Sequence, residues 1–348
     1  MAPPLCATCG KIRAQILRPS NHQRVCAGCF TSLFEGEVYS VITSHSLFTR
    51  GEKIAIGASG GKDSCVLAAV LHTLNQRYDL GLELVLLSID EGITGYRDHS
   101  LDAVRRNAAA LDLPLYILSY KELYGWSMDQ VVAQIGKKGN CTYCGVFRRQ
   151  ALDRGASRLG VRHVVTGHNA DDVAETVLMN LLRGDVARLG RTCSIVTSTP
   201  GEVKGGSTEE VQITDVKRSK PLMYAYEKEI VLYAHHRKLD YFSTECIYSP
   251  EAFRGSARTL IKNLERIRPE SILHITTQKP RNATGDMATV PIRRKQKTTT
   301  TRTNEEAKLG KCERCGYLSS QKVCKACVLL DGLNKARPRT PIVVEQHG

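Results

Sequence analysis

Residues 53–64 read KIAIGASGGKDS, and this stretch decides the fold. Lys53–Ala58 is a short apolar run that ends in small residues, which is typical of a buried strand. Ser59–Ser64 is a glycine-rich turn, and Cys65–Leu74 has helical character with few helix breakers. A strand, a glycine turn and a helix in this order predict a phosphate-binding site, because glycines let backbone N–H groups approach an anion at the positive end of the helix dipole.

The turn is not a Walker A loop, which requires G-x-x-x-x-G-K followed by Ser or Thr. Here Lys62 is followed by Asp63, and Lys62 supplies a compact positive charge for a phosphate. An ordinary glycine turn is the alternative interpretation, but the motif lies between the strand and the helix that a phosphate site requires.

Further strands and helices alternate along the chain. Strands are expected at 82–89, 115–119 and 162–166, and helices at 99–111, 127–135, 145–159, 172–182 and 227–238. Glu175 follows Asp172 by three residues, close to a capping-box arrangement at the start of one helix. Strands that alternate with helices of about 10–15 residues indicate right-handed βαβ units, so the expected fold class is α/β with a doubly wound parallel sheet.

Two polar segments directly follow predicted strands. They are residues 88–92 (SIDEG) and 166–172 (TGHNADD). Surface carboxylates are usually only solvated, and that remains the alternative for each segment taken alone. Ligands of doubly wound sheets bind at the carboxyl ends of the strands, so the position of both segments favours a nucleotide role.

Lysine and arginine number 49 against 35 aspartate and glutamate residues, which gives a formal net charge of +14. Such an excess favours a polyanionic partner, because each neutralised phosphate releases counterions. A basic tail that only aids solubility is the alternative. No apolar run approaches the roughly 18 residues of a membrane span, and the first residues lack a signal-peptide pattern, so a cytoplasmic protein without membrane contact is expected.

Ten of the thirteen cysteines fall into five C-x-x-C pairs. In a cytosolic chain this density indicates metal or redox sites rather than disulfides. The two outer sets have the spacing of tetrahedral zinc sites, and zinc would supply about 10–16 kcal/mol of folding free energy to each short segment. Two zinc ribbons are therefore expected, and their ligands are Cys6, Cys9, Cys26, Cys29, Cys312, Cys315, Cys324 and Cys327.

The pair Cys141 and Cys144 has no second C-x-x-C within ribbon distance, and Arg148 and Arg149 follow it closely. Positive charge and a helix N-terminus favour thiolates, so these cysteines are candidates for a reactive or soft-metal site. Cys246 is a third candidate, and three thiolates would leave one iron of a cubane cluster open for another ligand. A two-cysteine redox switch and inert packing are the alternatives.

An N-terminal ribbon, the SGGKDS turn, the central C-x-x-C, an E-C-x-Y-S motif at 245–249 and a C-terminal ribbon occur in this order. This combination resembles the PP-loop ATP pyrophosphatases that form the catalytic subunits of cytosolic tRNA 2-thiouridine synthetases, which are related to bacterial and archaeal enzymes. The resemblance covers roughly residues 1–270 and 308–335.

The resemblance implies an adenine-nucleotide α-hydrolase-like PP-loop domain between two ribbons. The expected units are an N-terminal zinc ribbon (1–35), a PP-loop catalytic domain (36–275), a basic disordered linker (276–308), a C-terminal zinc ribbon (309–335) and a tail (336–348). The linker departs from the family pattern, which leaves the position of the second ribbon relative to the catalytic domain open.

The resemblance also implies the residues of the active site. Those that would contact ATP are Ala58, Ser59, Gly60, Gly61, Lys62, Asp63, Ser64, Ile89, Arg148, Gly167 and Asp172. The catalytic residues would be Cys141, Cys144, Cys246, Lys62 and Asp63. In the family the three cysteines are associated with a [4Fe–4S] cluster, and they have also been interpreted as a persulfide and disulfide pair.

The implied reaction is ATP-dependent 2-thiolation of the wobble uridine in cytosolic tRNAs for Lys, Glu and Gln, by adenylation of the base with Mg²⁺ present. Sulfur would come from a ubiquitin-related carrier protein with a C-terminal thiocarboxylate. A homologous second thiolation subunit is an expected partner, in a homodimer or heterodimer.

Two other functions stay open on the sequence alone. Another PP-loop chemistry, such as amidation or tRNA lysidine formation, would need neither the central C-x-x-C nor Cys246. A zinc-ribbon protein that binds nucleic acid and has a vestigial nucleotide site would release no pyrophosphate from ATP.

Overall fold

The computed structural model describes residues 4–137, 139–185, 188–189, 192–198, 216–244, 246–248, 253–277, 310–319 and 321–335. The expected basic linker at 276–308 lies outside these residues apart from its first two positions, and so does the expected tail at 336–348. Positions 245 and 249 of the E-C-x-Y-S motif also lie outside them.

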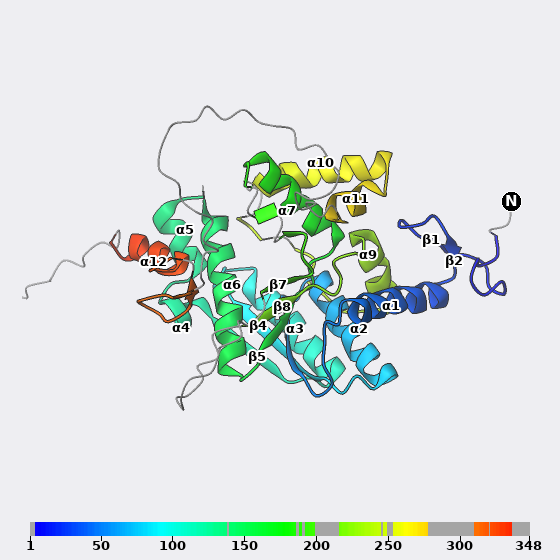
Figure 1. Cartoon of the computed structure of the whole chain (residues 1–348), viewed down its shortest axis with the longest axis horizontal. Coiled ribbons are helices and arrows are strands. Elements are labelled where there is room, and N and C mark those ends of the chain that lie inside the picture. The colour runs from blue at the N-terminus through cyan, green and yellow to red at the C-terminus, as the bar shows by residue number, and fades with distance from the viewer. Residues whose placement is uncertain are drawn as a thin grey trace, which may run out of the picture.

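A six-stranded sheet forms the centre of the molecule (Figure 1). Its strands are β3 (Lys53–Gly57), β4 (Glu83–Asp90), β5 (Leu115–Ser119), β6 (His163–Val165), β7 (Val196–Ser198) and β8 (Lys217–Ser219). Their order is β5-β4-β3-β6-β8-β7, and within this sheet only β7 runs antiparallel to its neighbour. The predicted α/β fold with a parallel sheet is confirmed, and the carboxyl ends of β3, β4 and β6 meet at one edge.

Eleven helices are described along the chain. They are α1 (Ala27–Ser44), α2 (Lys62–Tyr78), α3 (Arg97–Leu111), α4 (Tyr120–Tyr124), α5 (Met128–Ile135), α6 (Asn140–Arg158), α7 (Ala170–Leu182), α9 (Glu227–His236), α10 (Phe253–Ile267), α11 (Ser271–Thr277) and α12 (Lys325–Lys335). α6 begins earlier than predicted, so its first turn includes Cys141. α1, α4, α10, α11 and α12 lie where no helix is predicted. Within the described parts of the chain, no helix combines the length and apolar character that a membrane crossing requires.

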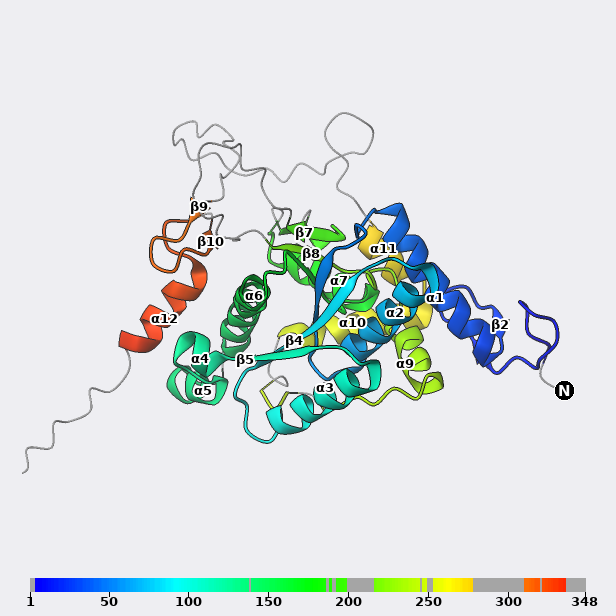
Figure 2. The same cartoon turned by 90° about the horizontal axis from the view of Figure 1, so that it is seen from below.

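The two faces of the sheet pack against different helices (Figure 2). Ile54 and Ile56 of β3 lie in a core with apolar residues of α1, α2 and α9. Ala55, which points to the opposite face, lies in a second core with Ala156 of α6. Because both faces are covered, β3 and β4 are apolar along nearly their whole length, as is usual for a parallel sheet.

The capping box of α7 lies three residues earlier than the predicted one. Asn169 is the N-cap, and its side chain accepts a hydrogen bond from the N–H of Asp172 at 3.0 Å. The Asp172 carboxylate accepts the reciprocal bond from the N–H of Asn169 at 3.4 Å. The predicted box of Asp172 with Glu175 is wrong, because α7 begins at Ala170 and Asp172 is already inside its first turn. Glu175 instead pairs with Arg254 of α10 at 2.9 Å.

Two four-cysteine groups lie at opposite ends of the molecule (Figures 1 and 2). The N-terminal group is Cys6, Cys9, Cys26 and Cys29, and the C-terminal group is Cys312, Cys315, Cys324 and Cys327. In each, a two-stranded hairpin precedes a helix: β1 (Ile16–Leu17) and β2 (Arg24–Val25) precede α1, and β9 (Gly310–Lys311) and β10 (Leu318–Ser319) precede α12. The expected boundary between residues 35 and 36 falls inside α1, whose apolar side joins the core with α2 and α9.

Candidate active site

Close backbone contacts require glycine at Gly60 in the SGGKDS turn and at Gly167 after β6. Gly60 has a φ of +75°, and a Cβ atom there would lie 2.4 Å from the backbone oxygen of Ser100. A Cβ atom at Gly167 would lie 2.8 Å from the backbone of Asp63. The turn after β3 and the loop after β6 therefore touch through backbone atoms, which only glycine permits at these positions.

Hydroxyl groups fix the turn at the start of α2. The Ser64 hydroxyl donates to the backbone oxygen of Gly61 at 2.9 Å, and the N–H of Ser59 donates to the Ser64 hydroxyl at 3.2 Å. Ala58 is tied to β4, because its N–H donates to the backbone oxygen of Leu87 at 2.9 Å. An anion at this turn would meet the N-terminus of α2 in a fixed position.

Lys62 lies in a network of charges from three helices. Its Nζ atom is 2.7 Å from Glu227 Oε1 at the start of α9 and 3.4 Å from Asp63 Oδ2. Lys262 of α10 is 2.8 Å from the same Glu227 carboxylate. Burial raises the pKa of Glu227, but hydrogen bonds from Lys262 and Lys62 outweigh it and lower the pKa to about 2. Sequence reasoning missed Glu227, because 165 residues separate it from Lys62 and no motif surrounds it.

Asp63 and Asp172 lie on either side of Asn169. The Asn169 side-chain amide donates to Asp63 Oδ1 at 3.0 Å, while its oxygen accepts from the N–H of Asp172 at 3.0 Å. Burial raises the pKa of Asp63 and the charge of Asp172 raises it further, so that the pKa is raised despite the opposing charge of Lys62. Two neighbouring carboxylates of this kind are suited to a hard cation, which would relieve their mutual repulsion.

Arg148 contacts one of the three central cysteines, Cys141, Cys144 and Cys246, and acts electrostatically on all of them. Cys141 and Cys144 lie in the first two turns of α6, and Arg148 Nη2 donates to Cys144 Sγ at 3.3 Å. Arg148 Nε is also 2.9 Å from Glu91 Oε1, directly after β4. The positive charge of Arg148 lowers the pKa of all three thiols, so it lies close to each.

Positive charge favours the thiolates at these positions, as expected, but burial outweighs it. Burial raises the pKa of each central cysteine above its usual value, and Arg148 lowers it by less. The physical reason is that removal from water disfavours the charged thiolate, and one guanidinium that already pairs with Glu91 does not offset this.

The segment that carries Cys246 passes over the phosphate-binding turn. The N–H of Phe242 donates to the backbone oxygen of Gly60 at 2.8 Å, and Cys246 follows four residues later. Four extended residues span at most about 14 Å, so Cys246 lies within roughly that reach of the turn. Beyond the cysteine, the Tyr248 hydroxyl donates to Asp129 Oδ1 of α5 at 2.7 Å, which fixes the other end of the segment.

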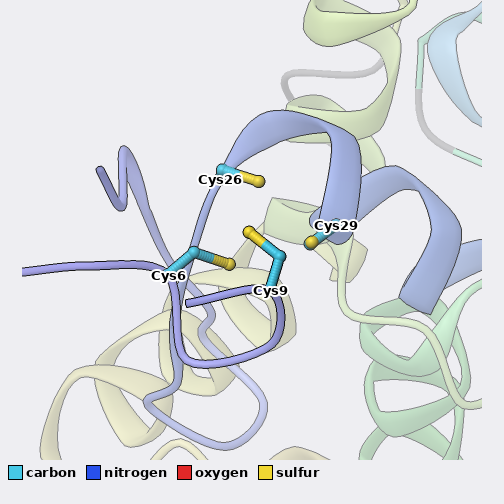
Figure 3. Close-up of side chains that lie close together, drawn as sticks. All are labelled: Cys6, Cys9, Cys26 and Cys29. Carbon is cyan, nitrogen blue, oxygen red and sulfur yellow. The ribbon is translucent and has the colours of Figure 1, made fainter. Parts of the chain in front are cut away.

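The four-cysteine groups differ from the central cysteines in spacing. Within each group all the ligand atoms lie within 4.8 Å of one another, and Figure 3 shows the N-terminal sulfurs turned toward one another. In the described part of the chain the central cysteines form no such group. In the C-terminal group, Cys312 and Cys327 Sγ are 3.9 Å apart and Cys315 and Cys324 Sγ are 3.6 Å apart. Zinc–sulfur bonds of about 2.3 Å give tetrahedron edges of about 3.8 Å, so these thiols fit zinc.

The C-terminal group packs directly against α6. The side-chain amide of Gln150 donates to Cys324 Sγ at 3.5 Å, six residues along α6 from Cys144. Cys144 and Cys246 pack against the same apolar core that contains Cys312 and Cys324. The position of the second ribbon, which the sequence leaves open, is therefore beside the central cysteines.

Family models match both parts of the chain. One described as a PP-loop domain matches residues 34–264, and one described as a zinc-ribbon matches residues 310–341. The cytoplasmic tRNA 2-thiolation protein 1 of Aspergillus niger is 65% identical over 345 residues, which cover 99% of this chain and 93% of that protein. The protein of the same name from Schizosaccharomyces pombe is 56% identical over 338 residues, which cover 96% and 92%.

A solved structure extends the similarity to the whole architecture. It is the U34-tRNA thiolase NcsA from Methanococcus maripaludis with its [4Fe–4S] cluster, which is 28% identical and superimposes with a TM-score of 0.73. The superposition covers 96% of this chain and 97% of that one, so it includes both ends as well as the sheet.

Proposed function

The chain belongs to the PP-loop family of cytoplasmic tRNA 2-thiolation proteins, and from this premise we propose that it replaces the C2 oxygen of the tRNA wobble uridine with sulfur at the expense of ATP. The tRNAs are the cytosolic acceptors of Lys, Glu and Gln. The reaction takes place in the cytoplasm, as the names of the relatives state for those proteins.

One contact carries this proposal. The hydrogen bond from the Phe242 N–H to the Gly60 oxygen ties the segment that bears Cys246 to the phosphate-binding turn. Arg148 links the same region to the carboxyl end of β4, because it contacts both Glu91 and Cys144. A nucleobase placed between these elements can reach the α-phosphorus of a nucleotide and the central cysteines without moving to a second site.

In the first step the C2 oxygen of the uridine attacks the α-phosphorus of ATP. The bond to the β-phosphate breaks, pyrophosphate leaves, and the N3 proton of the base is released. Lys62 and the N-terminus of α2 stabilise the charge that develops on the phosphate oxygens. Glu227 holds Lys62 in place from the side, at 2.7 Å.

In the second step hydrosulfide at the central cysteines attacks C2 of the adenylated base. The C2–O bond breaks, AMP leaves with the former uridine oxygen, and the proton of hydrosulfide returns to N3. Activation is needed because the C2 oxygen is otherwise a poor leaving group. Arg148, which donates to Cys144 Sγ at 3.3 Å, keeps a positive charge next to the attacking sulfur.

Three kinds of metal site fit the residues. Each four-cysteine group would hold one structural zinc ion, and Asp63 and Asp172 would hold Mg²⁺ against the triphosphate. The central cysteines do not form a compact four-ligand group, and their three sulfur atoms would hold a [4Fe–4S] cluster. When bound, that cluster supplies one open iron for the incoming sulfur.

The sulfur donor in the cell would be a ubiquitin-related carrier protein with a C-terminal thiocarboxylate. A homologous second thiolation subunit would complete the enzyme. The excess of positive charge would hold the tRNA backbone, which contributes affinity and position rather than base recognition.

The test is a single-turnover reaction of the anaerobically purified protein with ATP, Mg²⁺, sulfide and unmodified tRNA. Nucleoside mass spectrometry should detect 2-thiouridine, together with one pyrophosphate for each product. Lys62→Met should abolish both products, whereas Cys246→Ala should abolish 2-thiouridine alone. Full 2-thiouridine formation by Cys246→Ala would contradict the proposal, and pyrophosphate release by wild type without 2-thiouridine would indicate another PP-loop chemistry.

A further inference from the structure

A second set of positive charges lies at the carboxyl edge of the sheet, beside the phosphate-binding turn. β6 and β8 are parallel neighbours, so Lys220, directly after β8, lies next to the loop after β6 that carries His168. Arg149 of α6 joins them, because its backbone oxygen accepts a hydrogen bond from Arg218 of β8 at 3.2 Å. Arg149, His168 and Lys220 are called the cation cluster below.

Within the described ranges, no member of the cation cluster forms an ion pair with a carboxylate, although a basic neighbour does. Arg218 forms an ion pair with the buried Asp153. Lys220 is only 8% exposed, yet among the residues that the structure describes its Nζ atom donates only to the backbone oxygen of Thr192, at 3.0 Å. A buried ammonium group that keeps free donors and no counter-charge is costly, unless an anion binds to it.

The pKa shifts of the three groups agree with the lack of an ion-paired carboxylate in the cluster. Burial lowers the pKa of Lys220 to about 8, and the charge of Arg149 acts in the same direction. Burial and the charge of Arg218 lower the pKa of Arg149. Burial and the basic neighbours of His168 lower its pKa, although the charge of Asp172 opposes this shift. Each of these shifts would be reversed by an anion among the three groups.

We propose that the cation cluster is a binding site for a phosphodiester of the RNA substrate, next to the nucleotide that enters the active site. This inference rests on the proposed function, since it takes tRNA as the substrate. Arg149 follows directly after Arg148, which contacts Cys144 Sγ at 3.3 Å, so α6 carries both the cation cluster and the thiol site. The site would anchor the backbone while the base reaches Cys144.

The position of the cluster distinguishes RNA from ATP as the source of the phosphate. Lys62 and the N-terminus of α2 lie at the end of β3, whereas Lys220 lies at the end of β8, two strands away. Two strand spacings amount to roughly 9–10 Å, which separates Lys220 from the turn that would hold the triphosphate. Arg149 and His168 are closely surrounded by protein but keep solvent-exposed surface, so a polymer can reach the cluster from solvent.

The experiment measures tRNA and ATP affinity of the full-length protein for Lys220→Met and Arg149→Gln. Each variant should bind tRNA about tenfold more weakly, because a charge-assisted hydrogen bond is lost. The slope of log K against log salt should become shallower by about 0.7–1 for each removed cation. ATP affinity should stay at the wild-type value. Lys220→Arg, which keeps the charge, should restore most of the tRNA affinity.

Lys121→Met is the matched control, because Lys121 is an exposed lysine of α4 outside the cluster. Arg149→Gln changes an exposed side chain and carries the test if Lys220→Met fails to fold. Unchanged tRNA affinity in folded variants would overturn the inference, and so would a loss of ATP affinity with tRNA binding intact. If wild type itself does not bind tRNA, the proposed function fails together with this inference.

Discussion

The four-cysteine groups and the central cysteines use the same side chain in opposite ways. In each four-cysteine group the ligand atoms lie within 4.8 Å of one another, as a single tetrahedral metal requires. The sulfur atoms of the central cysteines do not come together in this way, and Cys144 contacts the guanidinium group of Arg148 instead. Under the proposed function, this difference separates sites that stabilise the fold from a site that keeps room for a reactant.

The two four-cysteine groups also differ from each other in what they support. The N-terminal group is continuous with the core of α1, α2 and α9, on the face of the sheet that α2 covers. The C-terminal group shares its core with Cys144 and Cys246 and contacts α6 through Gln150. Loss of either metal should therefore weaken a different part of the molecule.

The largest expected effect comes from Cys144→Ala. Thiolation should fall to background, because a ligand of the reactive site is removed, while zinc content stays at two ions per chain and the melting temperature changes little. Nucleoside mass spectrometry, metal analysis and calorimetry on one preparation measure all three quantities. A drop in zinc content would show that the zinc sites depend on Cys144, which would contradict the distinction between the two kinds of cysteine site.

Gly60→Ala tests the phosphate-binding turn and leaves all cysteines unchanged. A Cβ atom at this position would lie 2.4 Å from the Ser100 oxygen at a positive φ, so the turn must deform and ATP affinity should fall at least about tenfold. Gly36→Ala is the control, because Gly36 lies in α1 with open space around it, and alanine there should stabilise the helix by up to about 1 kcal/mol. Normal ATP binding by Gly60→Ala in calorimetric titration would contradict the assigned role of the turn.

Loss of one metal ligand at each end sharpens the contrast between the two groups. Cys324 and Cys26 both directly precede a helix and are both buried. Cys324→Ser should increase the alkylation rate of Cys144 several-fold, because α6 loses part of the core that covers this thiol. Cys26→Ser should leave that rate unchanged. Mass spectrometry of the alkylated peptide gives both rates, and equal rates in the two variants would show that the C-terminal group does not support the thiol site.

The smallest expected effect is a change in the unfolding free energy when the charge network at Lys62 loses Glu227. This network contains no metal ligand of the four-cysteine groups. The pKa of Glu227 is lowered to about 2, so its stabilising charge is fully present above its unfolded pKa of about 4.5 and is lost as the pH falls toward 2. Glu227→Gln should cost about 1–3 kcal/mol of unfolding free energy at pH 7 and progressively less below pH 4. Urea unfolding at several pH values measures this difference, and a cost that grows on acidification would contradict the sign.

Local spacing explains which features the sequence predicts. All residues of the strand, turn and helix around Gly60 lie within a few tens of positions in the sequence, and so do those of each four-cysteine group. The structure confirms their arrangement. Partners that come from distant segments have no such signal, as Glu227 and Phe242 show. The raised pKa of Cys144 has no signal in the sequence for a related reason, since its charged neighbours are visible there but its burial is not.

The central claim is that one nucleobase meets both the nucleotide and the central cysteines, and an isotope experiment tests it most directly. A tRNA with ¹⁸O at C2 of the wobble uridine is converted in a single turnover, and the AMP is analysed by mass spectrometry. One ¹⁸O-labelled AMP for each 2-thiouridine is the predicted result, since the uridine oxygen leaves on the phosphate. Formation of 2-thiouridine with unlabelled AMP would contradict the claim.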